Sequence, residues 1–412
     1  MRTIHIPRRF VLDFWGGTET VIMETCRRLP SHAVDCQIFC SAALTEPGAE
    51  HVAGIPVQRF PYFYPYLGLK PESKEALDLK GGNLFSFALY RQLMREPSLD
   101  LIHLHTAKRL GGIGRTVARK RNIPYVVTIH GGMIDVPAEE AATWTAPTAG
   151  TFEWGKALGM LVGSRRVLED ADAIICVDSN ETERMQKRYP HKRVEFLANG
   201  VDPQPYQSGD GARFRRDNDI APEQKIILVV SRIDPQKNQR LAVEVLDRVR
   251  RSGEDAKLVL IGPVTNTDYH VALQADIQTA GLAEHVLLIP GLPPGSQALY
   301  DAYAAADLFL LSSVHEPFGI VILEAWAAGT PVVAAAVGGV PAFTHDGDDV
   351  LHFTSNDAGG AAQQILELFG NTDLANKLIS NGSQLARGKY HWDTITGQLV
   401  ELYTDIIEKR KP

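Results

Sequence analysis

The chain has 412 residues, of which 44% are hydrophobic and 22% are charged, an ordinary globular composition that is long enough for two domains. Its formal net charge of −7 argues against general binding of nucleic acid. No apolar run approaches the roughly 20 residues of a membrane-spanning helix, and the N-terminal segment lacks the apolar core of a signal peptide. We therefore expect a cytoplasmic protein.

Short apolar strands alternate with helical patterns along the chain. A strand over residues 1–7 is followed by a helix over 21–29. The clearest later strands cover residues 101–104, 125–129, 173–177, 226–230, 258–261, 286–289, 308–311 and 332–335. Their hydrophobic residues are continuous, which is typical of strands covered on both faces in a parallel sheet. With helices such as 239–251 and 361–369 between them, the order predicts doubly wound α/β sheets.

A domain boundary is predicted near residues 199–211. Asn199-Gly200, two prolines and a Ser-Gly-Asp-Gly run give this segment the composition of a linker, and a new strand–helix cycle opens after it. We therefore predict the α/β class with two Rossmann-like domains facing a central cleft, over residues 1–204 and 205–390. The C-terminal helix, residues 391–412, is expected to complete the first domain.

The turn between the first strand and the first helix contains Gly16 and Gly17. Paired glycines let the backbone approach a ligand, and the helix start adds its positive end, so an anion could bind here. An ordinary strand-to-helix turn explains the pair equally well, because no intact Gly-x-Gly-x-x-Gly pattern is present.

Three histidines lie at the ends of predicted strands in the first domain. His130 ends the strand 125–129 beside two glycines, where it could donate to a sugar hydroxyl or transfer a proton. A structurally bonded histidine is the alternative. His103 and His105 share one face of another strand, so a metal pair is geometrically possible. No third ligand is evident at a useful spacing, and we expect no metal there.

Arg232 and Lys237 lie on the loop after the first strand of the second domain. Two fixed cations at this carboxyl end would hold a pyrophosphate and neutralise the charge that develops on a departing phosphate. The alternative is that Arg232 forms a surface ion pair with Asp234, worth about 0–1 kcal/mol.

The most informative stretch is Glu316-Pro317-Phe318-Gly319-Ile320-Val321-Ile322-Leu323-Glu324. It joins a strand end to a helix start, the edge of a parallel sheet where ligands bind. Gly319 would let backbone N–H groups approach a phosphate. Glu316 could accept hydrogen bonds from sugar hydroxyls, and Glu324 could reach a ribose diol. The alternative for Glu324 is a carboxylate that merely complements the helix dipole.

Two further patterns carry no predicted chemistry. Asp170-Ala171-Asp172 resembles a metal-binding Asp-x-Asp, but it precedes a strand rather than ending one, and we interpret it as a solvated turn. The four cysteines, of which two share one face of the predicted strand 34–40, are interpreted as buried small apolar groups, with redox or metal chemistry as the alternative; they are Cys26, Cys36, Cys40 and Cys176.

Taken together, these positions resemble the retaining GT-B glycosyltransferases of glycosyltransferase family 4. The resemblance rests on Gly16-Gly17, His130, Arg232 with Lys237, and Glu316 with Glu324, and on the matching segments 198–202, 299–307, 329–333 and 338–341. It spans nearly the whole chain and is weakest between residues 40 and 100. The chain departs from the family where Ala342 replaces a frequent Glu and Ser231 replaces a common Gly.

The resemblance implies transfer of a hexosyl unit from a nucleotide-diphosphate sugar to a hydroxyl acceptor, with retention of configuration. A UDP-sugar is favoured, with GDP-mannose next, and the product would enter glycan, glycolipid or polysaccharide biosynthesis. No cofactor or catalytic metal is expected, because side-chain cations take that role.

The resemblance also implies a role for each site residue. Arg232 and Lys237 would hold the diphosphate, and Glu316 and Glu324 would bind the transferred sugar and the ribose. His130 would lie at the anomeric carbon. The remaining donor contacts would come from Gly16, Gly17, Ile289, Phe318, Gly319, Ile320 and Val321.

Other functions remain open. A nucleotide-sugar epimerase or hydrolase of GT-B-like fold would act without an acceptor, which distinguishes it from a transferase. A catalytically silent binder fits less well, because the charged positions are intact. An NAD-dependent oxidoreductase would need the glycine-rich fingerprint that this chain lacks.

The acceptor is expected to be a sugar or a lipid-linked sugar. One predicted helical region is basic, with Lys108, Arg109, Arg115, Arg119, Lys120 and Arg121. Near an anionic leaflet each cation could contribute about 1 kcal/mol, so weak association with the inner face of the membrane is one hypothesis. A solvated helix face is the other. Aromatic residues that could instead stack on a soluble sugar are Phe60, Tyr62, Phe63, Tyr64 and Tyr66.

Overall fold

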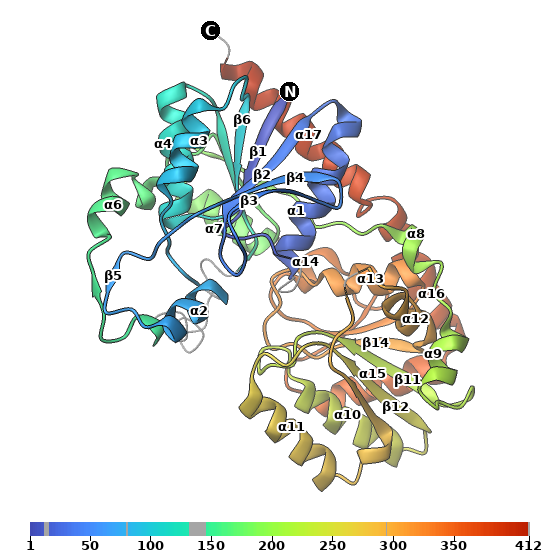
Figure 1. The fold of residues 1–412 in the computed structure, drawn as a ribbon. Coiled ribbons are helices and arrows are strands. Elements are labelled where there is room, and N and C mark those ends of the chain that lie inside the picture. The colour runs from blue at the N-terminus through green and yellow to red at the C-terminus, as the bar shows by residue number, and fades with distance from the viewer. Residues whose placement is uncertain (12–15, 80, 132–145, 294, 411–412) are drawn as a thin grey trace. The chain divides into compact units, whose positions relative to one another are not determined.

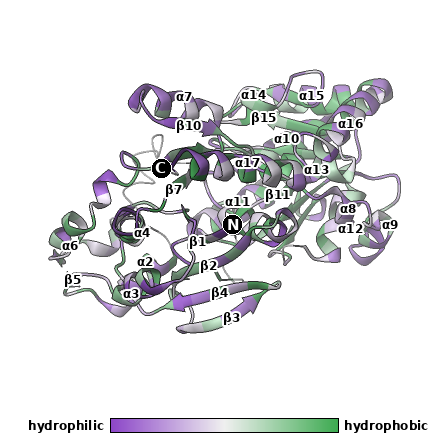
Figure 2. Ribbon diagram, turned by 90° about the horizontal axis from the view of Figure 1, so that it is seen from above, coloured by the Kyte–Doolittle hydropathy of each residue, from purple (hydrophilic) through white to green (hydrophobic). Residues whose placement is uncertain are grey.

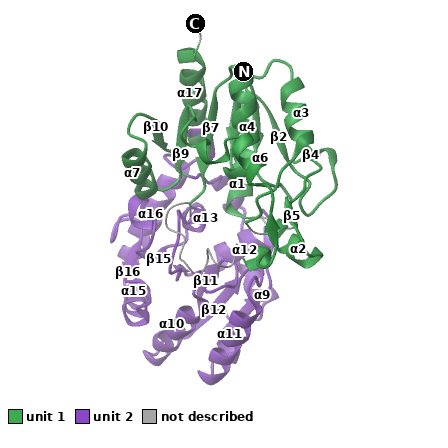
Figure 3. Cartoon of the chain, turned by 90° about the vertical axis from the view of Figure 1, so that its left-hand side faces the viewer, with its two compact units in different colours: residues 1–198, 395–412 green, residues 199–394 purple. Residues whose placement is uncertain are grey.

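The computed structural model describes residues 1–11, 16–79, 81–131, 146–293 and 295–410. The chain divides into two compact units, residues 1–198 with 395–412 (unit 1) and residues 199–394 (unit 2), as Figures 1 and 3 show. Each unit is built on a sheet of parallel strands connected by helices. The predicted α/β class with two Rossmann-like domains is therefore confirmed.

The sheet of unit 1 has the strand order β10-β9-β7-β6-β1-β2-β4-β3, and its described pairs are parallel except β3 with β4. Its strands are β1 (Arg2–Ile6), β2 (Asp35–Ser41), β3 (Gly48–Val52), β4 (Ile55–Phe60), β6 (Leu101–Leu104), β7 (Tyr125–Ile129), β9 (Ala173–Cys176) and β10 (Arg193–Phe196). A short antiparallel pair joins β5 (Tyr66–Leu67) to β8 (Phe152–Glu153). The helices are α1 (Gly17–Arg28), α2 (Pro71–Leu79), α3 (Phe87–Arg95), α4 (Lys108–Arg121), α6 (Lys156–Leu161), α7 (Ser179–Arg188) and α17 (Trp392–Arg410).

Helices cover both faces of this sheet, which explains why its strands are apolar without alternation. On one face, Ile4 and Ile6 of β1 pack into a cluster with residues of α3 and α4. On the other, Cys36 and Ile38 of β2 pack with α1 and with the C-terminal helix α17, whose core residues are Leu399, Leu402, Tyr403 and Ile406. The end of the chain thus contributes to the core of unit 1.

The sheet of unit 2 is parallel throughout the described pairs, in the order β13-β12-β11-β14-β15-β16. Its strands are β11 (Lys225–Val230), β12 (Ala256–Ile261), β13 (Val286–Ile289), β14 (Leu308–Leu311), β15 (Val332–Ala335) and β16 (Leu351–Phe353). The helices are α8 (Pro203–Tyr206), α9 (Gly211–Asp217), α10 (Gln239–Arg251), α11 (Thr267–Thr279), α12 (Gln297–Ala305), α13 (Ile320–Ala328), α14 (Val340–Phe343), α15 (Ala358–Gly370) and α16 (Thr372–Arg387).

Hydropathy explains the arrangement of the elements. The strands at the centre of unit 2 are largely apolar, whereas helices such as α7 and α9 are strongly hydrophilic (Figure 2). Every residue of β14 and β15 is buried, as expected for strands between two helical layers. Because the carboxyl ends of parallel strands share one edge, the loops after β11 and β14 meet there.

The segment predicted to be a linker is ordered. The break between the units follows Ala198, compared with the predicted boundary after residue 204. Val201 exchanges backbone hydrogen bonds with Tyr390 and Trp392, at 2.8 and 3.1 Å. Gly200 lies so close to the Trp392 ring that a Cβ there would approach a ring carbon to 2.7 Å. The glycine is therefore explained by close packing within unit 2.

Candidate active site

The loops after β11 and β14 bring two of the predicted site residues together. Lys237 Nζ lies 2.6 Å from Glu316 Oε2, and Ser313 Oγ donates to the same carboxylate oxygen at 3.2 Å. The side chains of Lys237 and Glu316 are only 15% and 9% exposed. Because this pair is largely shielded from water, removing one partner would leave an uncompensated charge in the fold and destabilise it.

Hydrogen bonds between the two loops fix this pair in place. Ser312 Oγ donates to the Lys237 carbonyl at 2.9 Å, and Gln236 Nε2 donates to the His315 carbonyl at 3.0 Å. The Val314 amide donates to the Gln236 carbonyl at 2.9 Å. The predicted site residues did not include Ser312, Ser313 or Gln236. The sequence indicated these residues only by their position on the two loops. The result is a preorganised site of the kind that favours electrostatic catalysis.

Arg232 lies on the same loop but is more exposed. Its side chain is 42% exposed, and Nη1 lies 3.2 Å from Asp234 Oδ2. Nη2 donates to Gln236 Oε1 at 3.3 Å. The ion pair with Asp234, whose side chain is only 10% exposed, is the alternative that the sequence left open.

The helix α13 begins directly beside Glu316. Gly319 precedes it with φ 94°, in the left-handed region that glycine favours. A Cβ at this position would lie 3.4 Å from Glu316 Cγ, so the helix start and the carboxylate are in contact distance. The first amides of a helix, here those of Ile320 and Val321, have no acceptor within the helix. They give the helix start its affinity for anions.

The second carboxylate, Glu324, lies in a different environment from the first. Tyr303 donates its hydroxyl to Glu324 Oε2 at 2.7 Å, and Tyr206 also donates to the carboxylate. Burial raises the pKa of Glu324, although the residue as a whole is partly exposed. The structure therefore places Glu316 beside a lysine and Glu324 beside two tyrosines.

Phe318 and Ile289 are constrained by the fold. The ring of Phe318 is buried and stacks on Phe343, with centroids 4.4 Å apart, so only its backbone is available to a ligand. Ile289 ends β13, and its carbonyl accepts from the amides of Gly262 and Gly291 at 3.0 and 2.8 Å. These contacts make the turn after β13 rigid.

In unit 1, the carboxylate of Glu19 binds at the predicted anion site of Gly16 and Gly17. Gly16 precedes α1, and its backbone N–H donates to the carboxylate of Glu19 in the first turn. Burial raises the pKa of Glu19, and the neighbouring Arg9 opposes that rise. This is the geometry of a glutamate that caps its own helix. An anionic ligand would have to compete with it.

His130 follows β7 and belongs to a chain of bonded histidine rings. Its Nε2 lies 2.8 Å from His105 Nδ1, and His105 Nε2 lies 3.0 Å from His5 Nδ1. The sequence offered both the catalytic and the bonded interpretation of His130, and the second is what the structure displays. Although the residue reaches the surface in part, burial of the ring lowers the pKa of His130 to about 4. His130 is therefore neutral near pH 7.

This lowered pKa predicts a loss of stability in acid. An unfolded histidine takes up a proton near pH 6.5, whereas folded His130 does so near pH 4, so stability is complete above 6.5 and falls below it. At pH 5 the loss from His130 is about 2 kcal/mol. Burial also lowers the pKa values of His103 and His105, so the wild type loses further stability in acid from these residues. Urea unfolding near pH 7.5 and pH 5 should therefore show a smaller difference in His130→Gln than in the wild type.

The control for this experiment is His51→Gln, because His51 is exposed in β3 of the same unit. It should retain the full pH dependence of the wild type. An unchanged pH dependence in His130→Gln would show that the ring is not held neutral by burial.

Two family models match the chain in the order of its units. The 4-like domain of glycosyl transferases matches residues 16–200, and the model of glycosyl transferases group 1 matches residues 210–385. The chain belongs to the group 1 glycosyltransferases. The family of the sequence-based resemblance is thereby confirmed.

Curated relatives of this glycosyltransferase extend over nearly its full length. D-inositol 3-phosphate glycosyltransferase of Acidothermus cellulolyticus is 27% identical over 412 residues, covering 96% of this chain and 87% of the relative. The enzyme of the same name from Actinosynnema mirum is 29% identical over 405 residues, covering 94% and 92%.

Solved structures establish that the glycosyltransferase has the GT-B fold. Sucrose-phosphate synthase from Thermosynechococcus elongatus matches with a TM-score of 0.72 at 19% identity, covering 99% of both chains. Anabaena HepE in complex with UDP-glucose matches with a TM-score of 0.72 at 20% identity, covering 98% of this chain and 100% of that one.

The basic residues of helix α4 in this glycosyltransferase do not form a free cationic patch. Arg109 and Arg115 are buried and pair with Glu153 and Asp170. The other four also have partners within unit 1: Lys108 with the Gly81 carbonyl, Arg119 with Asp170, Lys120 with the Tyr90 hydroxyl and Arg121 with the Leu93 carbonyl. Arg109 and Arg115 are therefore not available to an anionic surface. Lys108, Arg119 and Lys120 remain exposed, so weak association with the membrane stays a prediction. Among the described residues, no helix is both long and apolar enough to span a membrane.

Two further interpretations change with the structure. Asp170 is not part of a solvated turn, because its side chain is 9% exposed and pairs with Arg115, Arg119 and Arg166. Of the predicted acceptor aromatics, Phe60 and Tyr64 are buried, and the hydroxyls of Tyr62 and Tyr64 both donate to Asp78. These aromatic residues therefore stabilise the fold of unit 1 around α2.

Proposed function

We propose that this glycosyltransferase moves a hexosyl unit from a UDP-sugar to a hydroxyl acceptor, with retention at the anomeric carbon. The observation that carries the proposal is the buried Lys237–Glu316 pair at the start of α13. It combines a fixed cation, helix amides and a carboxylate in one place, which is what a sugar diphosphate requires. A nucleotide-binding neighbour of the same fold, HepE in complex with UDP-glucose, favours UDP over GDP, with GDP-mannose as the second choice.

Each group of unit 2 then has a role in binding the donor. Lys237 and Arg232 hold the diphosphate, together with the amides of Gly319, Ile320 and Val321. Glu316, whose carboxylate is oriented by Lys237 and Ser313, accepts hydrogen bonds from the transferred sugar. Glu324 binds the ribose from its place beside Tyr303.

The proposed chemistry follows from these charges. As the bond between the anomeric carbon and the phosphate breaks, negative charge develops on the leaving diphosphate, and the two fixed cations stabilise it. The same phosphate accepts the proton of the incoming hydroxyl on the front face, which gives retention. Because Lys237 and Arg232 supply the positive charge, we propose transfer without a catalytic metal.

His130 of unit 1 is proposed to act as a neutral imidazole. With its Nε2 bonded to His105, the remaining ring nitrogen is the one available to a sugar hydroxyl. A neutral ring with a pKa of about 4 hydrogen-bonds without adding charge, so its role is to orient the sugar and not to protonate it.

For the acceptor we propose a sugar, a lipid-linked sugar or a polyol phosphate. The last joins the candidates because the curated relatives are named D-inositol 3-phosphate glycosyltransferases. The product would enter glycan, glycolipid or polysaccharide synthesis. An epimerase or hydrolase of the same fold is the second candidate, distinguished by turnover of the donor without any acceptor.

The test of the donor site is thermal stabilisation by UDP, GDP and ADP, each compared with the same chelator without nucleotide. A ligand that binds only the folded protein adds about 2.7 kcal/mol at 100 times its dissociation constant. We expect UDP to stabilise the protein selectively. Lys237→Met should weaken this stabilisation, because free UDP carries the charge that develops on the leaving diphosphate.

The outcomes separate the proposals. A selective rise in unfolding temperature with GDP would indicate GDP-mannose as the donor in place of a UDP-sugar. A shift that appears only without chelator would contradict metal-independent binding. No shift with any of the three nucleotides would contradict the proposed donor site.

A further inference from the structure

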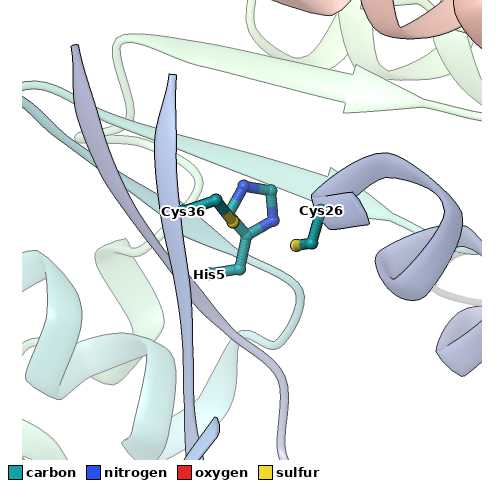
Figure 4. A group of neighbouring side chains, drawn as sticks. All are labelled: His5, Cys26 and Cys36. Carbon is teal, nitrogen blue, oxygen red and sulfur yellow. The ribbon is translucent and has the colours of Figure 1, made fainter. Parts of the chain in front are cut away.

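A cluster of buried metal-ligating groups lies inside unit 1, and none of its members is assigned to the donor. Figure 4 shows that His5 of β1, Cys36 of β2 and Cys26 of α1 come together from three different elements. Cys26, Cys36 and His5 are 1%, 5% and 0% exposed. The sequence favours apolar core positions for these cysteines, because nothing in their spacing shows that α1 brings Cys26 beside Cys36.

The parallel register of β1 and β2 explains why these residues share one face of the sheet. Thr3 lies opposite Cys36, and His5 lies opposite Ile38 two residues further along. Alternate residues of a strand point to the same side, so Thr3, His5 and Cys36 all point toward the layer of α1 and α17. Cys26, in the last turns of α1, lies against these residues.

The distances suit a tetrahedral ion. One ligand atom from each of Cys26, Cys36 and His5 lies within 4.8 Å of the others. In a zinc site with Zn–S of about 2.3 Å and Zn–N of about 2.0 Å, ligand atoms are roughly 3.6–3.8 Å apart. The three groups therefore need to close by at most about 1 Å, which side-chain rotation can supply. The phenol of Tyr403, 3.4 Å from His5 Nε2, is a candidate for the fourth position.

The charges of the three ligands match a divalent cation. Cysteine binds zinc as the thiolate and histidine binds it as the neutral imidazole. A buried thiolate without a counter-charge is costly. Two thiolates and a neutral imidazole around one Zn²⁺ give a net charge of zero, which removes that cost.

A second group of possible ligands, His5 with His103 and His105, competes poorly. The nitrogens of His103 bond to Tyr403 and Thr128, and those of His105 bond to His130 and His5. A metal ion there would have to break these contacts. At the first cluster a metal ion would replace the weak thiol hydrogen bonds that Cys36 makes with Cys26, His5 and Thr3. It would also replace one contact of the His5 ring, with either His105 or Tyr403.

We propose that Cys26, Cys36 and His5 form a structural Zn²⁺ site that ties α1 to strands β1 and β2. The ion lies in the core of unit 1 and takes no part in the transfer chemistry proposed for unit 2. Because the ligands are buried, the ion enters as the unit folds and contributes to its stability. Its loss would weaken the packing of α1 (Gly17–Arg28) against the sheet.

The test is the metal content of the full chain, expressed with added Zn²⁺ and purified under a thiol reductant. We expect one equivalent of zinc in the wild type and none in Cys26→Ala and Cys36→Ala. Matched controls are Cys40→Ala and Cys176→Ala, which remove buried cysteines outside the cluster and should retain the ion. Chelator under mild denaturation should lower the unfolding temperature of the wild type and of the controls.

A second measurement needs no variant. Wild-type protein refolded with Co²⁺ should show thiolate-to-cobalt charge-transfer bands and the visible bands of tetrahedral coordination. Absence of these bands, or zinc well below one equivalent after refolding with Zn²⁺, would overturn the proposal. Zinc retained in both alanine variants at the wild-type level would do the same.

Discussion

Lys237→Met is expected to lower the rate of hexosyl transfer about 10²–10³-fold, the usual effect of removing one preorganised electrostatic contact. Lys237 is held by the bond to Glu316 and by the contacts of its own backbone with Ser312 and Asp234. Its charge is therefore fixed before the diphosphate leaves. The effect should appear mainly in kcat, because developing charge is stabilised in the transition state.

The same pair has a separate effect on stability. Glu316 is 9% exposed, so Lys237→Met leaves a nearly buried carboxylate without its cation, and breaking a buried pair costs about 3–5 kcal/mol. Removing both charges in Lys237→Met with Glu316→Gln should restore most of that stability. It should not restore transfer. Urea unfolding and initial rates on the single and double variants measure the two effects independently.

A matched lysine is available in the same unit. Lys377 pairs with Asp348 at 3.2 Å, but both side chains are more than half exposed. Lys377→Met should change neither rate nor stability by a measurable amount, as expected for a surface pair. Near-normal transfer by Lys237→Met would show that other residues bind the diphosphate.

Gly338→Ala is expected to destabilise unit 2 by roughly 2–5 kcal/mol and to impair transfer with it. Gly338 has φ 56°, and its Cβ would lie 2.1 Å from the carbonyl oxygen of Glu316. The clash is with backbone, so the loop that carries Glu316 must move. The Gly339 amide, which donates to that carbonyl at 2.9 Å, would move with it.

Gly347→Ala separates strain from clash. Gly347 has φ 70° in the same unit, but a Cβ there would meet nothing within 4 Å. This variant should lose only the roughly 1–2 kcal/mol of a left-handed alanine and keep normal transfer. Equal effects of the two substitutions, measured by thermal unfolding and initial rates, would show that Glu316 does not depend on Gly338.

The amino-acid sequence determined the local structure and the edge of the sheet at which the site lies. Continuous apolar runs predicted β6, β7 and β14 at the residues where the structure has them. A strand that is buried on both faces is apolar at successive positions, so its pattern is easily recognised. The position of Lys237 and Glu316 after neighbouring strands then followed from the geometry of parallel sheets. Local pattern and topology were sufficient for both.

Only the tertiary structure decided which side chains are partners. Arg109 and Arg115 looked like part of a basic helix face, but acidic residues from distant segments bury and neutralise them. Cys26 and Cys36 looked like unrelated core residues, but helix packing brings them beside His5. These contacts join residues that are far apart in the sequence, and no helical or strand periodicity relates them. Their energies depend on burial and on charge at short range, and the linear order of the chain encodes neither directly.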